Sequence, residues 1–454
     1  MPVSTIKDLT DQFRALGVST VYVKHLSKKQ DNEKNQIYFG SGLNSVTNIF
    51  PATIDARSPS ESTLKRKSDK GKPKLEAQID LAWLSDNGAL HPAPNTRIID
   101  YFQYPEVRMS VFLAGCNFAP DALRRRFQAG FGKRILALGL APSGQVIGRV
   151  LTERDDPLVS EFPNLPVLAA APIFQVLIVD RPIGSSPLEL LKTELGRIIA
   201  SGWHSSRILK PNSAGPIPFR GAQGAGYTLE ALLGVVANAK KAPDKHGFEI
   251  KSHGGARISL MTPTPDRGFQ GDHTFREFME RFGRPGQKAD GSIRFTGIHR
   301  CGTPNEKTGM ILRVSGYDPE TGSFVDEPDN VCVELALTST GEIVAAWSLA
   351  HLANAWNNKH ASAAYVPSSK RAAFAGADDD REYKFGPSIL VGQGTDVWKL
   401  LKAIHAGVVY YDPADSIYAD NTAKVRPQWR INANRLKEAL TPLYNSVEEI
   451  DLST

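Results

Sequence analysis

The chain has 454 residues, of which 41% are hydrophobic, and this length predicts two globular domains, or three. The formal net charge of +6 is a mild basic excess, which permits nucleic-acid binding without requiring it. Three widely spaced cysteines argue against a disulfide framework and a cysteine-rich metal site. No signal-peptide pattern opens the chain, and the longest apolar run is short and interrupted, so we expect a cytoplasmic protein that does not enter membranes.

The first 180 residues contain short extended segments separated by polar, turn-rich stretches. Several short strands at such intervals are typical of a β-barrel or a β-sandwich. We therefore expect a mostly-β domain over residues 1–180. The extended segments are 20–26, 35–40, 78–84, 107–115, 134–141 and 174–180.

Two basic segments interrupt this pattern. Residues 57–74 contain seven Lys and Arg residues among Ser, Pro and Gly, and Arg124–Arg126 is a run of three arginines. Each segment has two interpretations: a solvated loop, or a surface that contacts phosphates.

A helix is predicted from Ser186 to Ser201. Ser186 is placed to cap it, with Pro187 at the first helical position and Glu189 at the capping-box spacing. Leucines and an isoleucine recur on one face, and Gly202 is suited to end the helix. After it, longer helices alternate with strands. We therefore place a second domain at 185–454, with this helix as the connection.

A glycine-rich turn follows at Gly221, and we expect a helix from about Thr228, with Thr228 as its cap. A dinucleotide-binding fingerprint is excluded because residues 210–220 contain three prolines where a buried strand should precede the turn. Glu230 lies beside the apolar stripe of this helix. Its side chain is therefore placed to reach a neighbouring site.

The stretch Pro243–Ser252, PDKHGFEIKS, contains two acids and a lysine at close spacing. If residues 248–251 form a strand, Glu249 and Lys251 lie on one face, and Asp244 approaches from the strand's start. Two converging carboxylates repel each other unless a proton or a cation lies between them, and an oxygen-lined pocket suits Mg²⁺. With a lysine near the attacking water, the set suits metal-assisted hydrolysis of a phosphate ester.

The same stretch has a simpler interpretation. Residues 255–263 are a second strand candidate that could pair with the first, so the lysine and the acid could form an ordinary pair on a surface hairpin. Such a set of Asp, Glu and Lys is expected about once by chance in a chain of this length. His246 and His253 are interpreted either as proton relays or as solvated loop residues. Near Cys301 no zinc-ligand spacing occurs.

The run from Gly224 to Ser252, GAGYTLEALLGVVANAKKAPDKHGFEIKS, resembles the core of the MvaI/BcnI restriction endonucleases, relatives of the nicking enzyme MutH within the PD-(D/E)xK nuclease fold. The resemblance implies that Asp244 and Glu249 bind Mg²⁺ together with the main-chain carbonyl of Ile250. It also implies that Lys251 orients or activates the attacking water and that Glu230 supports the site.

The resemblance extends more loosely over residues 200–445, which predicts an α/β (α+β) nuclease domain. It includes KVRPQWRI, Lys424–Ile431. There Arg426, Trp429 and Arg430 are candidates for DNA contact, or else residues of the core or the surface.

Two segments of the first domain, Val21–Gly42 and Tyr104–Phe112, resemble the B3-type pseudobarrel that forms the effector-binding domain of EcoRII-type enzymes. That resemblance implies two arms that hold DNA. Lys and Arg anchor phosphates, whereas Asn, Gln, Glu and Arg pair with base edges. The implied contacts are Lys24, Lys28, Lys29, Lys34, Asn35 and Gln36 on one arm, and Glu106 and Arg108 on the other.

The two resemblances together imply a type II, IIE-like restriction endonuclease that uses Mg²⁺ and acts as a monomer. Its partner is double-stranded DNA, as substrate and as effector copy, and the implied site is CCWGG, where W is A or T. One alternative is a MutH-like nicking enzyme that responds to methylation. Another is a DNA-binding regulator without catalysis, although an intact set of Asp244, Glu249 and Lys251 argues against it.

Overall fold

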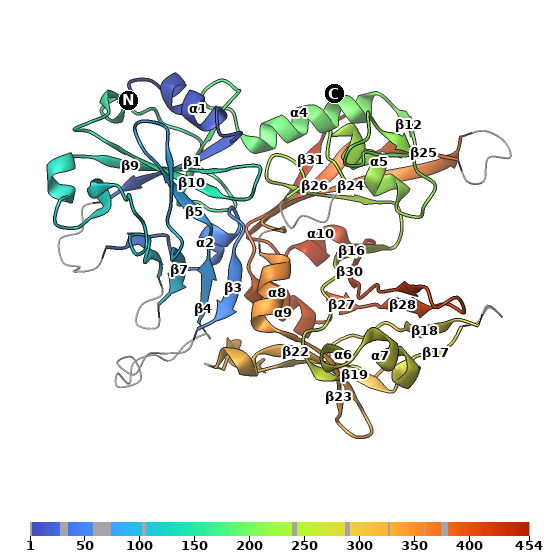
Figure 1. The fold of residues 1–454 in the computed structure, drawn as a ribbon. Helices are drawn as coiled ribbons and strands as arrows, with labels where there is room; N and C mark the ends of the chain where they lie inside the picture. Colours follow the sequence, from blue (N-terminus) through green and yellow to red (C-terminus); the bar gives the residue numbers. More distant parts are fainter. Residues whose placement is uncertain are drawn as a thin grey trace. The chain divides into compact units, whose positions relative to one another are not determined.

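The computed structural model describes residues 2–27, 35–57, 74–101, 106–237, 243–286, 291–325, 327–357, 359–373 and 380–453 (Figure 1). Two compact units divide the chain. The first is formed by the described residues of Met1–Asp55 and Leu75–Thr193, and the second by those of Glu194–Thr454 together with Ala56, Arg57 and Lys74. Within the described ranges, no helix combines the length and the apolar character needed to cross a lipid bilayer.

β-Strands form most of the first unit, as its short extended segments predict. The run 20–26 becomes a strand in which buried Val21 and Val23 alternate with more exposed neighbours. In spatial order, one sheet contains β11 (Gln175–Ile178), β1 (Thr20–Leu26), β9 (Arg134–Leu140), β10 (Val146–Thr152), β5 (Leu81–Leu84) and β6 (Leu90–Pro92). Strands β10 and β5 are parallel, and the other neighbours are antiparallel.

A second sheet of the first unit brings together the segments that resemble DNA-binding arms. Its strands, in order, are β2 (Ile37–Tyr38), β8 (Val107–Ser110), β7 (Arg97–Asp100), β4 (Leu75–Gln78) and β3 (Thr53–Ala56). Tyr38 lies opposite Arg108 in the β2–β8 pair. This register places Gln36, just before β2, opposite Ser110 at the end of β8, and the Gln36 Nε2 donates to the Ser110 Oγ at 3.2 Å.

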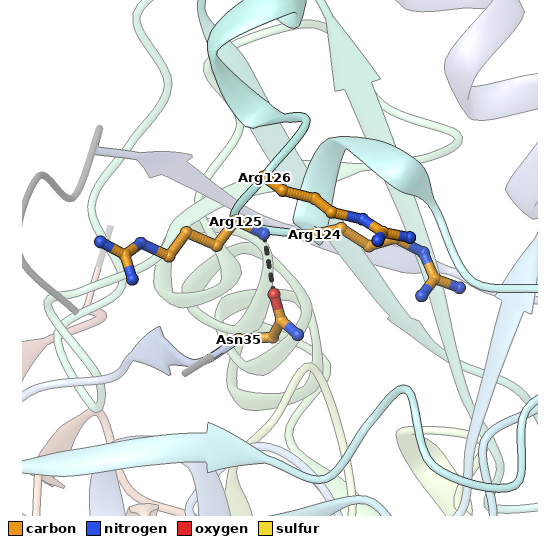
Figure 2. A pocket seen from close by; sticks show the side chains of 4 residues that line it. All are labelled: Asn35, Arg124, Arg125 and Arg126. Carbon is orange, nitrogen blue, oxygen red and sulfur yellow. Dashed lines mark hydrogen bonds between the residues drawn. The ribbon is translucent and has the colours of Figure 1, made fainter. Parts of the chain in front are cut away.

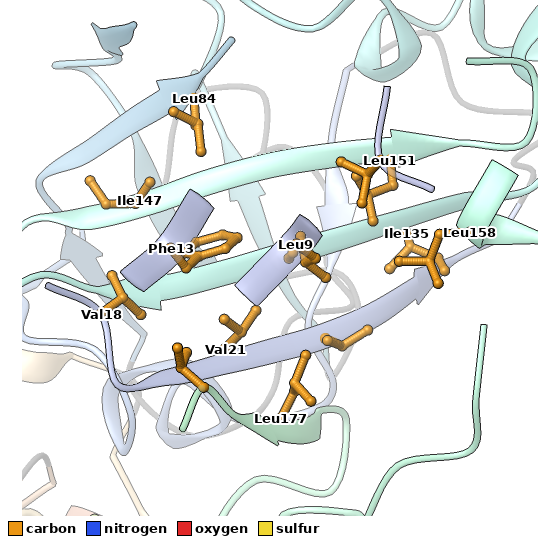
Figure 3. Close-up of a cluster of buried hydrophobic side chains, with 14 of the residues drawn as sticks. Leu9, Phe13, Val18, Val21, Leu84, Ile135, Ile147, Leu151, Leu158 and Leu177 are labelled. Atoms are coloured by element: carbon orange, nitrogen blue, oxygen red, sulfur yellow. The ribbon is translucent and has the colours of Figure 1, made fainter. Parts of the chain in front are cut away.

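Helix α1 (Ile6–Arg14) packs against the first sheet (Figure 3). Thr5 begins the helix with a capping box, in which its hydroxyl accepts from the Asp8 N–H and the Asp8 carboxylate accepts from the Thr5 N–H. Gly139 allows the close approach, because a Cβ there would lie 2.8 Å from the Phe13 ring. The buried cluster includes Leu9, Phe13, Val18, Val21, Leu84, Ile135, Ile147, Leu151, Leu158 and Leu177.

One sheet of the second unit is mixed. Its strands, in order, are β12 (Trp203–Ser205), β25 (Arg381–Phe385), β24 (Ser362–Ala372), β26 (Ser388–Gln393) and β31 (Ser446–Asp451), and β15 (Glu249–His253) also pairs with β24. β15 is parallel to β24, with Glu249 opposite Ala363. The first five residues of β24 are all buried, which is typical of a strand covered on both faces.

Smaller sheets and helices complete the second unit. The further strand groups are β16 (Arg257–Met261), β30 (Trp429–Asn432) and β27 (Tyr410–Tyr411); β19 (Met310–Ser315), β22 (Cys332–Leu337) and β23 (Ile343–Ser348); β17 (Arg284–Pro285), β18 (Ile293–Thr296), β28 (Ala414–Ile417) and β29 (Ala423–Lys424); β13 (Arg207–Ile208) and β14 (Ile217–Pro218); and β20 (Tyr317–Asp318) and β21 (Ser323–Phe324). The α-helices among the described residues, besides α1, are α2 (Asn44–Thr47), α4 (Pro187–Ala200), α5 (Gly224–Leu232), α6 (Gly268–Asp272), α7 (Phe275–Phe282), α8 (Leu349–Trp356), α9 (Val397–His405) and α10 (Leu436–Leu440).

Helix α4 confirms the helix predicted after Ser186. The Ser186 hydroxyl accepts a hydrogen bond from the Glu189 N–H at 3.2 Å, and Leu191 and Leu195 are fully buried. Gly202 follows the helix with a φ of 83°, in the left-handed region that glycine adopts freely. The helix spans the division between the two units, which falls after Thr193.

Two expectations for the second unit are wrong. Strand β16 does not pair with β15, because β15 lies beside the buried strand β24 and β16 pairs with β30. Thr228 does not cap a helix, because α5 already begins at Gly224 and Thr228 is a buried residue within it. The Thr228 hydroxyl instead accepts from the Arg207 N–H at 3.1 Å.

Candidate active site

A two-residue turn separates the two carboxylates of the predicted metal site. Lys245 and Phe248 exchange main-chain hydrogen bonds of 3.0 and 2.8 Å. Between them, His246 and Gly247 have φ values of 49° and 80°. Two positive φ values in succession are characteristic of a type I′ turn. Asp244 directly precedes this turn and Glu249 directly follows it, so the turn determines how the two carboxylates face each other.

Strand β15 presents Glu249 and Lys251 on one face, as the period of two predicts. The Lys251 Nζ lies 2.5 Å from the Glu249 Oε1. Asp244 folds back onto the strand, where its Oδ2 accepts from the Ile250 N–H at 2.9 Å. The structure thus brings Asp244, Glu249 and Lys251 together at the start of β15.

Lys359 is a fourth charged residue of this group, and sequence reasoning missed it. Its Nζ lies 3.4 Å from the Glu249 Oε1. Lys359 precedes β24, whose parallel pairing with β15 brings two segments about 110 positions apart into contact. No local spacing could have indicated it, since only the strand pairing places this lysine at the site.

The Glu249 carboxylate is buried next to two lysines, which determine its charge state. Glu249 is only 2% exposed. Burial by itself favours its neutral form, but Lys251 and Lys359 outweigh this effect and lower its pKa to about 2. For Lys359, burial opposes its charge while Glu249 and Asp244 favour it, and the net effect raises its pKa. Glu249 is therefore ionised at neutral pH.

The pKa values of Glu230 and Asp244 shift in the opposite direction, upward. Burial and the nearby Asp244 and Glu249 charges raise the pKa of Glu230 to about 7. Burial and the Glu249 charge raise the pKa of Asp244 to about 6, against the Ile250 hydrogen bond. Three carboxyl groups therefore interact electrostatically, and when all are ionised their negative charge exceeds what the two lysines neutralise.

The residues present fit a hard divalent cation. The Glu249 Oε2 is buried and has no hydrogen-bond partner. This oxygen and the Asp244 carboxylate, whose charges repel each other, form a suitable ligand pair for Mg²⁺. Across the described ranges, no three His, Cys, Asp or Glu side chains converge closely enough to form a metal site by themselves. Main-chain carbonyl and water oxygens would have to complete the shell, which is usual for Mg²⁺.

The candidates for DNA contact in the second unit have different surroundings. Trp429 is fully buried, with its ring 5.0 Å from Trp347, so it is a core residue and not a DNA contact. Arg430 is half-buried and forms a 2.7 Å ion pair with Asp412. Arg426 is exposed. Only the two arginines remain candidates.

In the first unit, the arm candidates Gln36, Glu106 and Arg108 form one hydrogen-bonded group. The Arg108 guanidinium donates to the Gln36 Oε1 at 2.7 Å and forms an ion pair with Glu106. Lys24 is half-buried on β1, and burial lowers its pKa. Lys28, Lys29 and Lys34 lie outside the described residues.

Asn35 and the three consecutive arginines line an open hollow of about 560 Å³ (Figure 2). The arginines connect η1 (Asp121–Leu123) with η2 (Gln128–Phe131). The Asn35 Oδ1 accepts from the main-chain N–H of Arg125 at 2.8 Å. In Figure 2 the Arg125 side chain points away from those of Arg124 and Arg126. The sequence indicated the basic run but not its contact with Asn35.

Comparison with known proteins shows that most of the second unit matches a known enzyme family. The model of the MvaI/BcnI restriction endonuclease family matches residues 192–440. The chain is similar to restriction endonuclease MvaI in a complex with its cognate DNA substrate, with 20% identity, a TM-score of 0.44, and coverage of 58% of this chain and 98% of that one. For MvaI in the absence of DNA, the identity is 16%, the TM-score 0.32 and the coverage 60% and 100%. No curated protein matches the chain.

The raised pKa values of Glu230 and Asp244 predict how pH and metal affect stability. Their folded-state pKa values exceed the usual carboxyl values of about 4, so the stability they contribute is present below about pH 4 and is lost as pH rises through about 6 to 7. A cation that binds the ionised forms should reverse this loss. We expect Mg²⁺ to raise the Tm more at about pH 8 than at about pH 5.

The check is thermal unfolding with and without Mg²⁺ for the wild type and Asp244→Asn. The variant lacks one of the repelling charges, so its metal-free Tm should decline less between these pH values, and its Mg²⁺-dependent rise should be smaller. An equal Mg²⁺-dependent rise in the variant would exclude Asp244 as a ligand.

Proposed function

The chain belongs to the MvaI/BcnI restriction endonuclease family, and from this premise we propose that it hydrolyses DNA with Mg²⁺ held by Asp244, Glu249 and the Ile250 carbonyl. It is a type II restriction endonuclease, that is, a site-specific DNA nuclease. One observation supports the metal site above the others: the buried, unpartnered Oε2 of Glu249 lies in a group with an excess of negative charge.

The proposed mechanism assigns a role to each residue. Bound Mg²⁺ would neutralise charge on the non-bridging phosphate oxygens. Lys251 is assigned the role of orienting the attacking water, because its ammonium group is held beside Glu249. Lys359 shares the Glu249 Oε1 and keeps this carboxylate ionised in a buried position. Glu230 is assigned a supporting role from helix α5, where its raised pKa allows it to hold or release a proton near neutral pH.

For the whole chain we propose two domains, a B3-like DNA-binding domain at 1–180 and a PD-(D/E)xK nuclease domain at 185–454. The mostly-β composition of the first unit supports the former. Its proposed contacts to DNA are Lys24, Asn35, Gln36, Glu106 and Arg108, and the loop lysines Lys28, Lys29 and Lys34. In the nuclease domain, Arg426 and Arg430 are the proposed contacts.

The hollow at Asn35 adds a phosphate-contacting surface to this proposal (Figure 2). Arg126 is exposed and stacks on the Phe127 ring at 4.5 Å, and Arg124 pairs with exposed Asp121 at 3.0 Å. Exposed guanidinium groups next to an aromatic ring suit the DNA backbone. We propose that double-stranded DNA is both substrate and effector, that the protein acts as a monomer, and that its site is CCWGG.

The first prediction from this proposal concerns catalysis. Glu249→Ala and Lys251→Ala should each reduce Mg²⁺-dependent cleavage by roughly two to three orders of magnitude, because each removes a group that stabilises the transition state. Plasmid cleavage assays would measure this. Glu280→Ala and Lys437→Ala are matched controls, since both residues are more than half exposed on the same unit. Undiminished cutting by Glu249→Ala would refute the site.

The second prediction concerns DNA binding by the first unit. A fragment of residues 1–182 should bind duplex DNA with an affinity that falls steeply with salt. Arg126→Ala should weaken binding and reduce the slope of log K against log salt by about 0.9 for each phosphate that the variant no longer neutralises. Lys7→Ala also removes one positive charge, at an 82% exposed position on α1, and should not change the slope. Equal slopes for the two variants would contradict a phosphate contact at Arg126.

The third prediction concerns the effector role. A short cognate duplex added in trans should accelerate cleavage of a single-site plasmid by the full-length protein, because DNA bound by the first domain would favour the active arrangement of the second. Deleting residues 1–180 should remove this acceleration and spare cleavage itself. Initial rates over a range of duplex concentrations provide the measurement. If the duplex never accelerates the full-length protein, the first domain only adds affinity.

A further inference from the structure

Glu194 of helix α4 contacts both residues that begin the turn between Asp244 and Glu249. Its Oε2 lies 3.1 Å from the Lys245 Nζ, and its Oε1 lies 2.9 Å from the His246 Nε2. An ionised carboxylate has no proton to donate and can only accept hydrogen bonds, so the His246 ring nitrogen is the donor. Glu194 is 25% exposed, and the His246 side chain is 20% exposed. The histidine is therefore not the solvated loop residue that one interpretation expected.

The same contact connects a second helix. Besides its ion pair with Glu194, the Lys245 Nζ donates to the Leu233 carbonyl at 2.7 Å. Leu233 is the C-terminal cap of α5, the helix that contains Glu230. One ammonium group thus joins α4, the end of α5 and the turn. A carboxylate on α4 thereby restrains both segments that position the acids of the site.

The turn needs such a restraint because of its backbone conformation. His246 has a φ of 49°, in the left-handed region that residues with a Cβ rarely adopt. Type I′ turns usually have Asn, Asp or Gly at this position. A histidine there has no local side-chain hydrogen bond to its own backbone that would favour the conformation. Its ring is instead held from outside the turn by Glu194.

We propose that Glu194 is a positioning residue for the metal-binding carboxylates, acting through His246 and Lys245. The proposal rests on the Mg²⁺ site proposed above. Metal ligands have to be held within about half an ångström of their productive geometry. Without Glu194, the turn would sample other conformations, and the Asp244 carboxylate would lose its fixed position relative to Glu249. The expected defect is weaker metal binding, with chemistry that recovers when the metal is saturating.

The test measures Mg²⁺ binding to the full-length protein without DNA, by calorimetry and by the Mg²⁺ concentration at half-maximal rise in Tm. Glu194→Ala should weaken Mg²⁺ binding by roughly tenfold or more, as is typical when a group that orients metal ligands is removed. Glu194→Gln keeps an acceptor for His246 but loses the charge opposite Lys245, so its effect should be smaller. Cleavage at saturating Mg²⁺ should return to within a few-fold of the wild-type rate.

The matched control is Glu189→Ala. Glu189 lies on the same helix and also forms an ion pair, with Lys192, but its side chain is 65% exposed. This variant should bind Mg²⁺ like the wild type. A purely structural role for Glu194 would lower the metal-free Tm and leave the Mg²⁺ affinity unchanged, which the two measurements distinguish.

A rescue variant tests the turn directly. Glycine adopts positive φ values freely, so His246→Gly in the Glu194→Ala background should restore much of the Mg²⁺ affinity. The proposal is overturned if folded Glu194→Ala binds Mg²⁺ with wild-type affinity and the added glycine has no effect. If the alanine variant does not fold, Glu194→Gln takes its place in this comparison. If the wild type itself neither binds Mg²⁺ nor cleaves DNA with it, the proposed metal function fails first, and the role of Glu194 fails with it.

Discussion

The burial of one negative charge, the Glu249 carboxylate, is the constraint on which the candidate site depends. An ion removed from water loses on the order of several kcal/mol of solvation unless partners compensate it. Glu249 is only 2% exposed because β15 lies against the buried strand β24. The same pairing brings Lys359 to the Oε1, which Lys251 of β15 itself also contacts. The strand that buries the charge therefore also supplies part of its compensation, and the remaining oxygen is left without a partner.

How much of the site the sequence predicts depends on the distance along the chain between the residues involved. Asp244, Glu249 and Lys251 lie within eight positions, so the period of a single strand was enough to place Glu249 and Lys251 on one face, with Asp244 just before the strand. Lys359 comes from a distant segment and joins the site through a parallel pairing. A lysine or a glutamate in a long chain has no local property that distinguishes such a role. The distant contacts therefore became evident only from the fold.

The elements show the same division between local and distant information. The strand at 20–26 and the helix after Ser186 agree with the structure because alternation and capping are properties of neighbouring residues. The expected hairpin of β15 with β16 is wrong because partner choice depends on which strand buries more apolar surface, and β24 lies more than 100 positions away. Thr228 shows a further limit: Gly224 and Gly226 extend α5 toward its N-terminus, against their low helix propensity, because tertiary packing overrides it.

The type I′ turn between Asp244 and Glu249 also limits how this stretch can change during evolution. Because side chains alternate along a strand, one inserted residue would transfer Glu249 to the opposite face and bring an apolar neighbour into its place. Substitutions at the two central positions leave the spacing intact, and Asn or Gly at position 246 would suit the backbone conformation better than histidine. Homologous chains should therefore keep four residues between the two acids, while positions 246 and 247 vary among residues that accept a positive φ. The length of this turn is therefore constrained more tightly than the identity of its central residues.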